Sequence, residues 1–198
     1  PDKRALVWCN VDGEEHIFSF ADIKKYSNQM ANIFRSAGIG RGDRVMLVLK
    51  RHYEYWFAAI ALHKLGAVMI PATHMLTVHD FVYRIKASKA KAFVCTTQND
   101  VPQKITAALK EAGTTAKLWC VQKNADGFEN LTAAMKEASE ELERVQTLAT
   151  DPMMLYFTSG TTGYPKGVIH EHSYPLAHIV TAKYWHQAED NGLHFTVA

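Results

Sequence analysis

The sequence has little of what would mark an unusual class of protein. Its three cysteines, Cys9, Cys95 and Cys120, form no C-x-x-C pair, so neither a zinc site nor a disulfide framework is indicated. The net charge of +2 gives no reason to expect nucleic acid or an anionic membrane as a partner. No segment approaches the roughly 18 apolar residues of a membrane span, and no apolar signal core is present. We therefore expect a protein of a reducing, cytoplasmic setting.

Two common nucleotide-binding motifs are also missing. The Walker phosphate loop requires G-x-x-x-x-G-K-[ST], whereas here Tyr164 and Pro165 separate Gly163 from Lys166, and Gly167 follows the lysine. The dinucleotide fingerprint G-x-G-x-x-G is absent as well. If the chain binds nucleotide, it does so through another kind of loop.

Hydrophobic patterning predicts an α/β fold. A hairpin is expected over residues 6–18, with its turn at Asp12 and Gly13, and Ser19 is expected to cap the following helix in a capping box with Asp22. Apolar strands then alternate with helical segments; the expected strands are 45–49, 67–70, 92–95 and 117–121, and the expected helices are 53–65, 78–86 (with Thr77 as N-cap) and 101–111. Strands that are apolar on both faces and alternate with helices indicate a doubly wound, mostly parallel sheet with flanking helices.

The same signals predict the elements of the remaining chain. A helix is expected over 131–148, and its charged run 136–144 suggests a solvated face more readily than a partner surface. Strands at 153–157 and 168–170, a helix at 174–185 and a final strand at 193–198 complete the pattern. We expect a first α/β subdomain over 1–148 and, over 149–198, a phosphate loop with the start of a second subdomain. A last strand without its following loop suggests an amino-terminal part of a longer enzyme, because ligands bind at the carboxyl ends of such strands.

The most informative stretch lies between the expected strands at 153–157 and 168–170. It begins after the apolar run 153–157 and reads Thr158, Ser159, Gly160, Thr161, Thr162, Gly163, Tyr164, Pro165, Lys166. Glycines let backbone N–H groups approach an anion, hydroxyls add donors, and a lysine supplies a mobile positive charge. The alternative is an ordinary surface turn, which does not need these residue types packed after a buried strand. The stretch therefore predicts a phosphate-binding loop.

A resemblance supports this interpretation. Residues Thr158 to Val168 match every fixed position of the pattern [ST]-S-G-[ST]-T-G-x-P-K-G-V, so the stretch resembles the phosphate loop of the adenylate-forming superfamily, which includes acyl-CoA synthetases, luciferases and peptide-synthetase adenylation domains. Segments 18–23 and 62–71 resemble upstream stretches of that family in the expected order. Segments 42–45 and 83–91 look most like short- and medium-chain acyl-CoA synthetases. The similarity covers essentially the whole chain.

The resemblance implies a two-step ligation that uses ATP, Mg²⁺ and CoA. A carboxylate attacks the α-phosphate of ATP and releases pyrophosphate, and the CoA thiol then displaces AMP to give a thioester. In this interpretation Thr158 to Lys166 contact the triphosphate tail, and Lys166 is the catalytic residue of the loop. Met75 would line a CoA channel, although a simple loop before a helix is an equal alternative. Family members need adenine-binding, acidic and carboxy-terminal residues that residues 1–198 do not contain, so we expect this chain alone not to catalyse adenylation.

Other candidates were weighed against plainer interpretations. His170 and His172 have a His-x-His spacing that could bind a metal on a strand, but no third ligand is evident, so no protein-held metal is predicted and a role in ordering the site is favoured. Four aromatic residues on one expected helix favour core packing: Tyr53, Tyr55, Trp56 and Phe57. Arg84 and Lys86 are interpreted as surface charges. Two other functions remain open: a non-catalytic nucleotide- or anion-binding module, and an adenylating enzyme for an amino or aryl acid.

Overall fold

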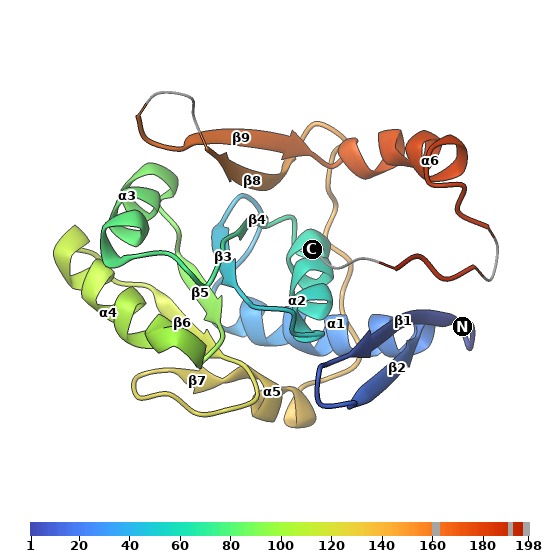
Figure 1. The fold of residues 1–198 in the computed structure, drawn as a ribbon, viewed down its shortest axis with the longest axis horizontal. Helices are drawn as coiled ribbons and strands as arrows, with labels where there is room; N and C mark the ends of the chain where they lie inside the picture. Colours follow the sequence, from blue (N-terminus) through green and yellow to red (C-terminus); the bar gives the residue numbers. More distant parts are fainter. Residues whose placement is uncertain (160–162, 190–191, 196–198) are drawn as a thin grey trace.

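The computed structural model describes residues 1–159, 163–189 and 192–195, and it is built around a seven-stranded sheet (Figure 1). The strand order is β7-β6-β5-β3-β4-β8-β9. The bounds are β3 Arg44–Val48, β4 Val68–Pro71, β5 Ala92–Cys95, β6 Lys117–Cys120, β7 Glu129–Asn130, β8 Pro152–Thr158 and β9 Lys166–Glu171. All neighbours are parallel except β8 and β9, which form an antiparallel pair at one edge. A separate antiparallel hairpin, β1 Arg4–Cys9 and β2 Glu15–Ser19, precedes the sheet. The expected α/β architecture and its amino-terminal hairpin are confirmed.

Helices cover both faces of the parallel strands. Their bounds are α1 Phe20–Ser36, α2 Glu54–Lys64, α3 Val78–Ser88, α4 Val101–Ala112, α5 Leu131–Ala134 and α6 Tyr174–Tyr184. Two 3₁₀ turns are assigned at Gln98–Asp100 (η1) and Met135–Glu137 (η2). In Figure 1, α1 and α2 lie on one side of the sheet, and α3 and α4 lie on the other. No helix in the described part of the chain is both long and apolar enough to cross a bilayer.

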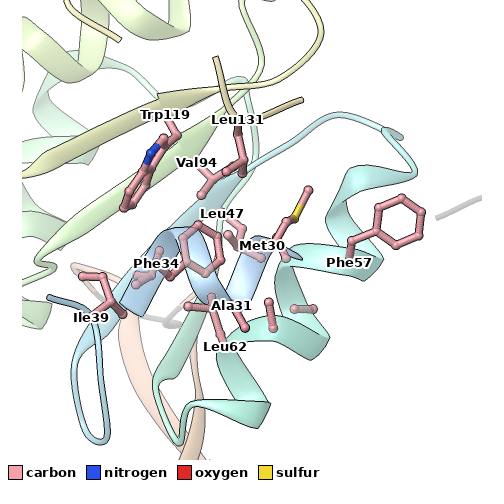
Figure 2. Close-up of a cluster of buried hydrophobic side chains, with 14 of the residues drawn as sticks. Met30, Ala31, Phe34, Ile39, Leu47, Phe57, Leu62, Val94, Trp119 and Leu131 are labelled. Carbon is pink, nitrogen blue, oxygen red and sulfur yellow. The ribbon is translucent and has the colours of Figure 1, made fainter. Parts of the chain in front are cut away.

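The side chains of β3 show why the fold needs both helical layers. Val45 and Leu47 point into a core shared with α1 and α2, whereas Met46 and Val48 point into a core shared with α3 and α4. Alternation with apolar residues on both sides is what a strand buried on both faces requires. Figure 2 shows the first core, where Phe34 of α1 packs against Trp119 of β6 with ring centroids 5.1 Å apart.

The helix caps expected from the sequence are present at α1 and α3. Ser19 accepts a hydrogen bond from the backbone N–H of Asp22, and the Asp22 carboxylate accepts from the Ser19 backbone, which completes a capping box at α1. Thr77 and Asp80 form the same device at α3. Each cap satisfies donors that the first helical turn leaves unpaired. Cys95 and Cys120 are buried, as expected, and burial raises the pKa of both thiols.

The expected helix over 131–148 is wrong. The α-helix ends at Ala134, a 3₁₀ turn follows, and residues 138–148, here called the strap, contain no helix. The strap runs along α1, whose side-chain amides donate to strap carbonyls: Asn28 to Glu140 at 2.7 Å, Gln29 to Ala138 at 3.2 Å, and Asn32 to both Ser139 and Glu141 at 2.8 Å. A helix would have used these carbonyls itself. The charged run 136–144 is therefore not the face of a helix.

One smaller expectation is wrong, and two features of the sheet are not predicted by the sequence pattern. The short strand β7 was not anticipated, and residues 192–195 are not in a strand, while 196–198 lie outside the described residues. Residues 168–170 do lie in a strand, but β9 returns antiparallel to β8 instead of adding a parallel strand. Both β8 and β9 belong to the same sheet as the five strands β3 to β7. The boundary proposed near residue 148 stays a prediction.

Candidate functional site

The predicted phosphate loop connects β8 to β9. Because β8 runs parallel to β4, the loop leaves the sheet at the edge where the parallel strands have their carboxyl ends. Of the nine predicted loop residues, Thr158 ends β8, Ser159 follows it, and Gly163, Tyr164 and Pro165 lead into β9 at Lys166. Gly160, Thr161 and Thr162 lie outside the described residues. The chain thus places the loop where α/β folds bind ligands.

The two ends of the loop are held together by the hairpin. Thr158 and Lys166 are Cα partners in the antiparallel ladder, and the Thr158 hydroxyl donates to the Lys166 carbonyl at 3.4 Å. Gly163 has φ of +88°, a conformation that residues with a side chain rarely adopt. The Lys166 side chain is exposed, and it makes no ion pair with any described residue. Its charge is therefore free to face a ligand from a backbone that the hairpin fixes.

Helix α3 contacts the described carboxyl-terminal half of the loop. The Tyr83 hydroxyl donates to the Pro165 carbonyl at 2.8 Å. The Tyr83 ring stacks on Tyr164 with centroids 4.8 Å apart and an interplanar angle of 15°. His79, one turn earlier on the same helix, has its ring centroid 6.0 Å from that of Tyr164. None of these contacts was anticipated from the sequence, although the i, i+4 spacing of His79 and Tyr83 places both rings on one face of a helix.

Arg84 is not the surface charge that the sequence suggested. Only 12% of its side chain is exposed, and the guanidinium lies 5.4 Å from the centroid of the Phe157 ring on β8. Asp80 lies 3.8 Å from the same guanidinium. Arginine stacks well on aromatic faces because its planar charge is weakly hydrated. Arg84 therefore helps to attach β8 to α3, whereas Lys86 is exposed as expected.

The described loop residues suit an anion better than a cation. Thr158, Ser159 and Lys166 are exposed hydroxyl and ammonium donors, and no carboxylate lies among the residues from 158 to 166. In the described residues, no group of three or more histidine, cysteine or acidic side chains could hold a metal. A polyphosphate would match such a donor set, since its oxygens accept hydrogen bonds from hydroxyls and lysine.

Met75 and several basic residues lie at the same edge of the sheet, beyond β4. Met75 is 71% exposed in the loop between β4 and α3. At the neighbouring strand ends, His52 is 3.0 Å from the Thr96 hydroxyl, and burial, followed by the charges of Lys50 and His74, lowers the pKa of His52. The position of Met75 is compatible with a channel lining, but a contact with CoA stays a prediction.

His170 and His172 have different neighbours. The His170 ring lies 4.2 Å from that of Tyr174, while His172 follows the end of β9 and its ring centroid is 6.1 Å from that of His63 on α2. The Nε2 atoms of His63 and His172 are both buried without a hydrogen-bond partner in the described part of the chain. The pair marks the junction between α2 and the turn that follows β9.

Two grooves flank α3. One, of about 450 Å³, lies between α3 and the β8–β9 hairpin; its lining includes Tyr83, Leu155, Phe157, Gly167 and Ile169. The other, of about 580 Å³, lies at the ends of α3 and α4 and at the start of β3; its lining includes Asp43, Arg44, Lys86, Lys89 and Lys91. Lysines near helix carboxyl ends complement the helix dipole, so the second groove needs no ligand to explain its charge.

Comparison with known proteins identifies the family of the chain. A family model described as AMP-binding enzyme matches residues 1–197. Human acyl-coenzyme A synthetase ACSM3, mitochondrial, is 39% identical over 189 residues, which are 93% of this chain and 32% of the relative. Human acyl-coenzyme A synthetase ACSM5, mitochondrial, is 37% identical over 188 residues, again 93% of this chain and 32% of the relative. The chain spans about a third of the length of these curated relatives.

Solved structures share the fold. The crystal structure of Brucella canis acyl-CoA synthetase aligns with a TM-score of 0.80 at 25% identity, covering 92% of this chain and 33% of that one. ATP-bound MatB from Rhodopseudomonas palustris aligns with a TM-score of 0.76 at 26% identity, covering 94% of this chain and 35% of that one.

Proposed function

Because the chain belongs to the family of AMP-binding enzymes, we propose that the full-length protein activates a short- or medium-chain carboxylic acid with ATP and transfers it to CoA. The observation that carries this proposal is the β8–loop–β9 hairpin at the carboxyl edge of the sheet, with exposed donors and Lys166 held at its end. ATP and CoA would be co-substrates, and Mg²⁺ would accompany the nucleotide.

The role proposed for this chain is stabilisation of the leaving group. In the first step a substrate carboxylate oxygen bonds to the α-phosphorus of ATP, and the bond between that phosphorus and the oxygen bridging to the β-phosphate breaks, releasing pyrophosphate. Thr158 and Ser159 hydroxyls, loop N–H groups and the Lys166 ammonium would meet the growing negative charge on the leaving phosphates. Mg²⁺, when bound, neutralises part of the same charge. In the second step the CoA thiol attacks the acyl carbon, and AMP leaves.

Substrate choice is a finer proposal. The resemblance to short- and medium-chain enzymes rests on segments 42–45 and 83–91, and the curated relatives carry the general name acyl-coenzyme A synthetase. That name gives no separate support for acetate. An exchange assay of the full-length enzyme across acids from acetate to medium chains, with aryl and amino acids included, identifies the preferred class.

The test of the proposed function is ATP–pyrophosphate exchange by the full-length enzyme. We expect Lys166→Ala to lower kcat of acid-dependent exchange by about 100-fold or more, because a positioned charge on a leaving phosphate acts mainly in the transition state. Lys110→Ala, which removes an exposed lysine in the last turn of α4, is the matched control and should leave exchange unchanged.

Two outcomes would contradict the proposal. A wild-type enzyme without exchange on any acid would favour the non-catalytic binding module. Full exchange by Lys166→Ala would remove the role given to the lysine while leaving the reaction class intact. We also propose that the 198-residue chain alone lacks exchange, since the relatives are about three times as long.

The compartment is proposed separately. Three free cysteines, one of them exposed, suit a reducing compartment. A cytoplasmic setting remains the proposal from the sequence, and it gains no support from the curated relatives, which are mitochondrial by name. Fractionation of cells expressing the full-length protein distinguishes the two.

A further inference from the structure

The contact between α3 and the loop assigns a role that no motif position carries. We propose that Tyr83 is a positioning residue that fixes the loop backbone next to Lys166, and thereby sets how the lysine meets the phosphates of ATP. This inference rests on the proposed function and adds to it a residue outside the loop.

The first step of the argument is the hydrogen bond. The Tyr83 hydroxyl donates to the carbonyl of Pro165, the residue directly before Lys166. Proline has no N–H, so Pro165 can be held through its backbone only at its carbonyl. The Tyr83 hydroxyl, from another element of the fold, donates to that carbonyl. A hydrogen bond between positions 82 residues apart fixes the loop to the sheet's helical layer.

The second step is the ring stack. Tyr164 is 60% exposed, yet its ring lies nearly parallel to that of Tyr83, and His79 approaches it as well. An exposed aromatic side chain held by two rings on consecutive turns of one helix is restrained without being buried. Offset stacking contributes beyond the area that it covers. Backbone and side chain of two successive loop residues are therefore held by α3.

The third step is the anchoring of Tyr83 itself. Its ring makes a T-shaped contact with Phe157 on β8, with centroids 6.2 Å apart, and its helix is capped by Thr77. Arg84, the next residue, lies over the same Phe157 ring. Tyr83 thus joins three parts of the site: the helix, the strand before the loop, and the loop after it. The Lys166 backbone is fixed from one side by Thr158 on β8 and from the other by Tyr83 through Pro165.

Lys166 and Tyr83 therefore have different roles. Lys166 supplies the charge, while Tyr83 reduces the number of backbone conformations from which that charge can act. Preorganisation of this kind lowers the cost of aligning a donor with a transition state. Removing the hydroxyl should weaken use of ATP while leaving the binding of the carboxylic acid intact.

The experiment compares Tyr83→Phe with wild type in the full-length enzyme. We expect kcat/KM for ATP in the exchange reaction to fall about fivefold to tenfold, as loss of one net hydrogen bond predicts, with KM for the acid within about twofold of wild type. Tyr26→Phe is the matched control, because Tyr26 packs among the rings of Phe18 and Phe57 in the opposite core and should change neither parameter.

A second measurement separates positioning from stability and from the proposed function. Amide hydrogen exchange of the full-length protein should be faster in Tyr83→Phe for peptides containing 163–167, and unchanged for peptides containing β3 and β5. Equal kinetic constants for Tyr83→Phe and wild type would overturn the proposal while leaving the reaction in place. If wild type lacks exchange activity, unchanged protection of 163–167 in the variant would overturn the positioning role independently.

Discussion

His63, which lies beside His172 where α2 meets the turn after β9, makes the stability of the fold depend on pH because it is buried. Burial lowers the pKa of His63 to about 4, with a smaller contribution from His172. The Nε2 atoms of both rings are buried and find no hydrogen-bond partner among the described residues. His63 is therefore neutral in the folded protein near pH 6, whereas an imidazole in the unfolded chain titrates near its ordinary value of 6.5.

The pH dependence follows from that difference. Between about pH 6.5 and pH 4 the unfolded chain binds the additional proton, so the free energy of unfolding falls as the pH falls through this range. We expect the free energy of unfolding of His63→Leu to fall less than that of wild type between pH 6.5 and pH 4, by on the order of 3 kcal/mol. Urea unfolding of both proteins between pH 8 and pH 4 measures this difference in the free energy of unfolding.

The same substitution at the exposed His178 serves as control for loss of an imidazole. If His63→Leu and wild type lose stability in parallel from pH 6.5 to pH 4, His63 is not the titrating group.

At the residue scale, the sequence shows the loop motif but not the residues that support it. Thr158 to Lys166 form a continuous motif, so their types and order can be read directly. Tyr83 and Arg84 could not be recognised, because their partners Pro165 and Phe157 lie more than 70 positions away and only the fold brings them together. A buried arginine and an exposed arginine have the same local sequence pattern.

At the scale of elements, the strap over residues 138–148 is the most informative error. Segment 131–148 contains many good helix formers, which is why a helix was expected. The structure instead packs Leu142 and Val145 against the α1–α2 core and binds the strap carbonyls to amides of α1. Contacts across more than 100 positions outweigh a propensity that is worth a few tenths of a kcal/mol per residue.

This account predicts unequal roles for two amides of α1. Asn28 is buried, donates to Glu140, and accepts from the Lys64 ammonium at 2.7 Å. Asn28→Ala should lower the free energy of unfolding by about 2 kcal/mol, because the partly buried Lys64 ammonium and the Glu140 carbonyl each lose a partner. Asn32→Ala, at a partly exposed position of α1 that donates to the same strap, should cost less than about 1 kcal/mol.

Chemical denaturation of both variants measures the difference. If Asn32→Ala lowers the free energy of unfolding as much as Asn28→Ala or more, burial of the amide does not determine its contribution to stability.

At the scale of the whole molecule, the sheet joins the strands β3 to β7 to the β8–β9 hairpin, and the junction between β4 and β8 is here called the seam. β3 pairs with β4 and with β5 over four residue pairs each, whereas β4 and β8 share a single Cα partner pair, Met69 and Met154. Asp151 reinforces this seam. Its carboxylate accepts from Arg41 at 2.7 Å and from the Leu148 N–H at 2.8 Å, and its carbonyl accepts from the His172 N–H at 3.0 Å.

We therefore expect Asp151→Ala to loosen the hairpin selectively. Amide hydrogen exchange should accelerate in β8 and β9 and stay at the wild-type rate in β3 and β5, since side-chain bonds at the seam are lost while the central ladder is untouched. Asp126→Ala, at an exposed loop carboxylate, is the control. Uniform acceleration across the whole sheet would mean that the seam does not separate two cooperative units.

The alternation of strands and helices made the parallel sheet predictable, because hydrophobic period and strand length are local properties. The antiparallel return of β9 was not predictable in this way: a strand of the same composition can pair in either direction, and the choice depends on the loop that connects it to β8. The short strand β7 gave no apolar signal, since it consists of Glu129 and Asn130.

The outer edge formed by β9 and α6 has a consequence for handling the protein. The described residues of this unit include exposed apolar side chains, namely Val168, Ile169, Leu176, Ile179, Val180, Tyr184 and Trp185, and α6 buries none of its own residues within the described chain. Among the described residues β9 is also the edge strand of the sheet (Figure 1), so no described strand pairs with its outer side. An apolar surface beside an open strand edge favours self-association through strand addition. We therefore expect the association state of residues 1–198 to change with protein concentration and salt. Charged substitutions along β9 would be the first change to make for crystallisation.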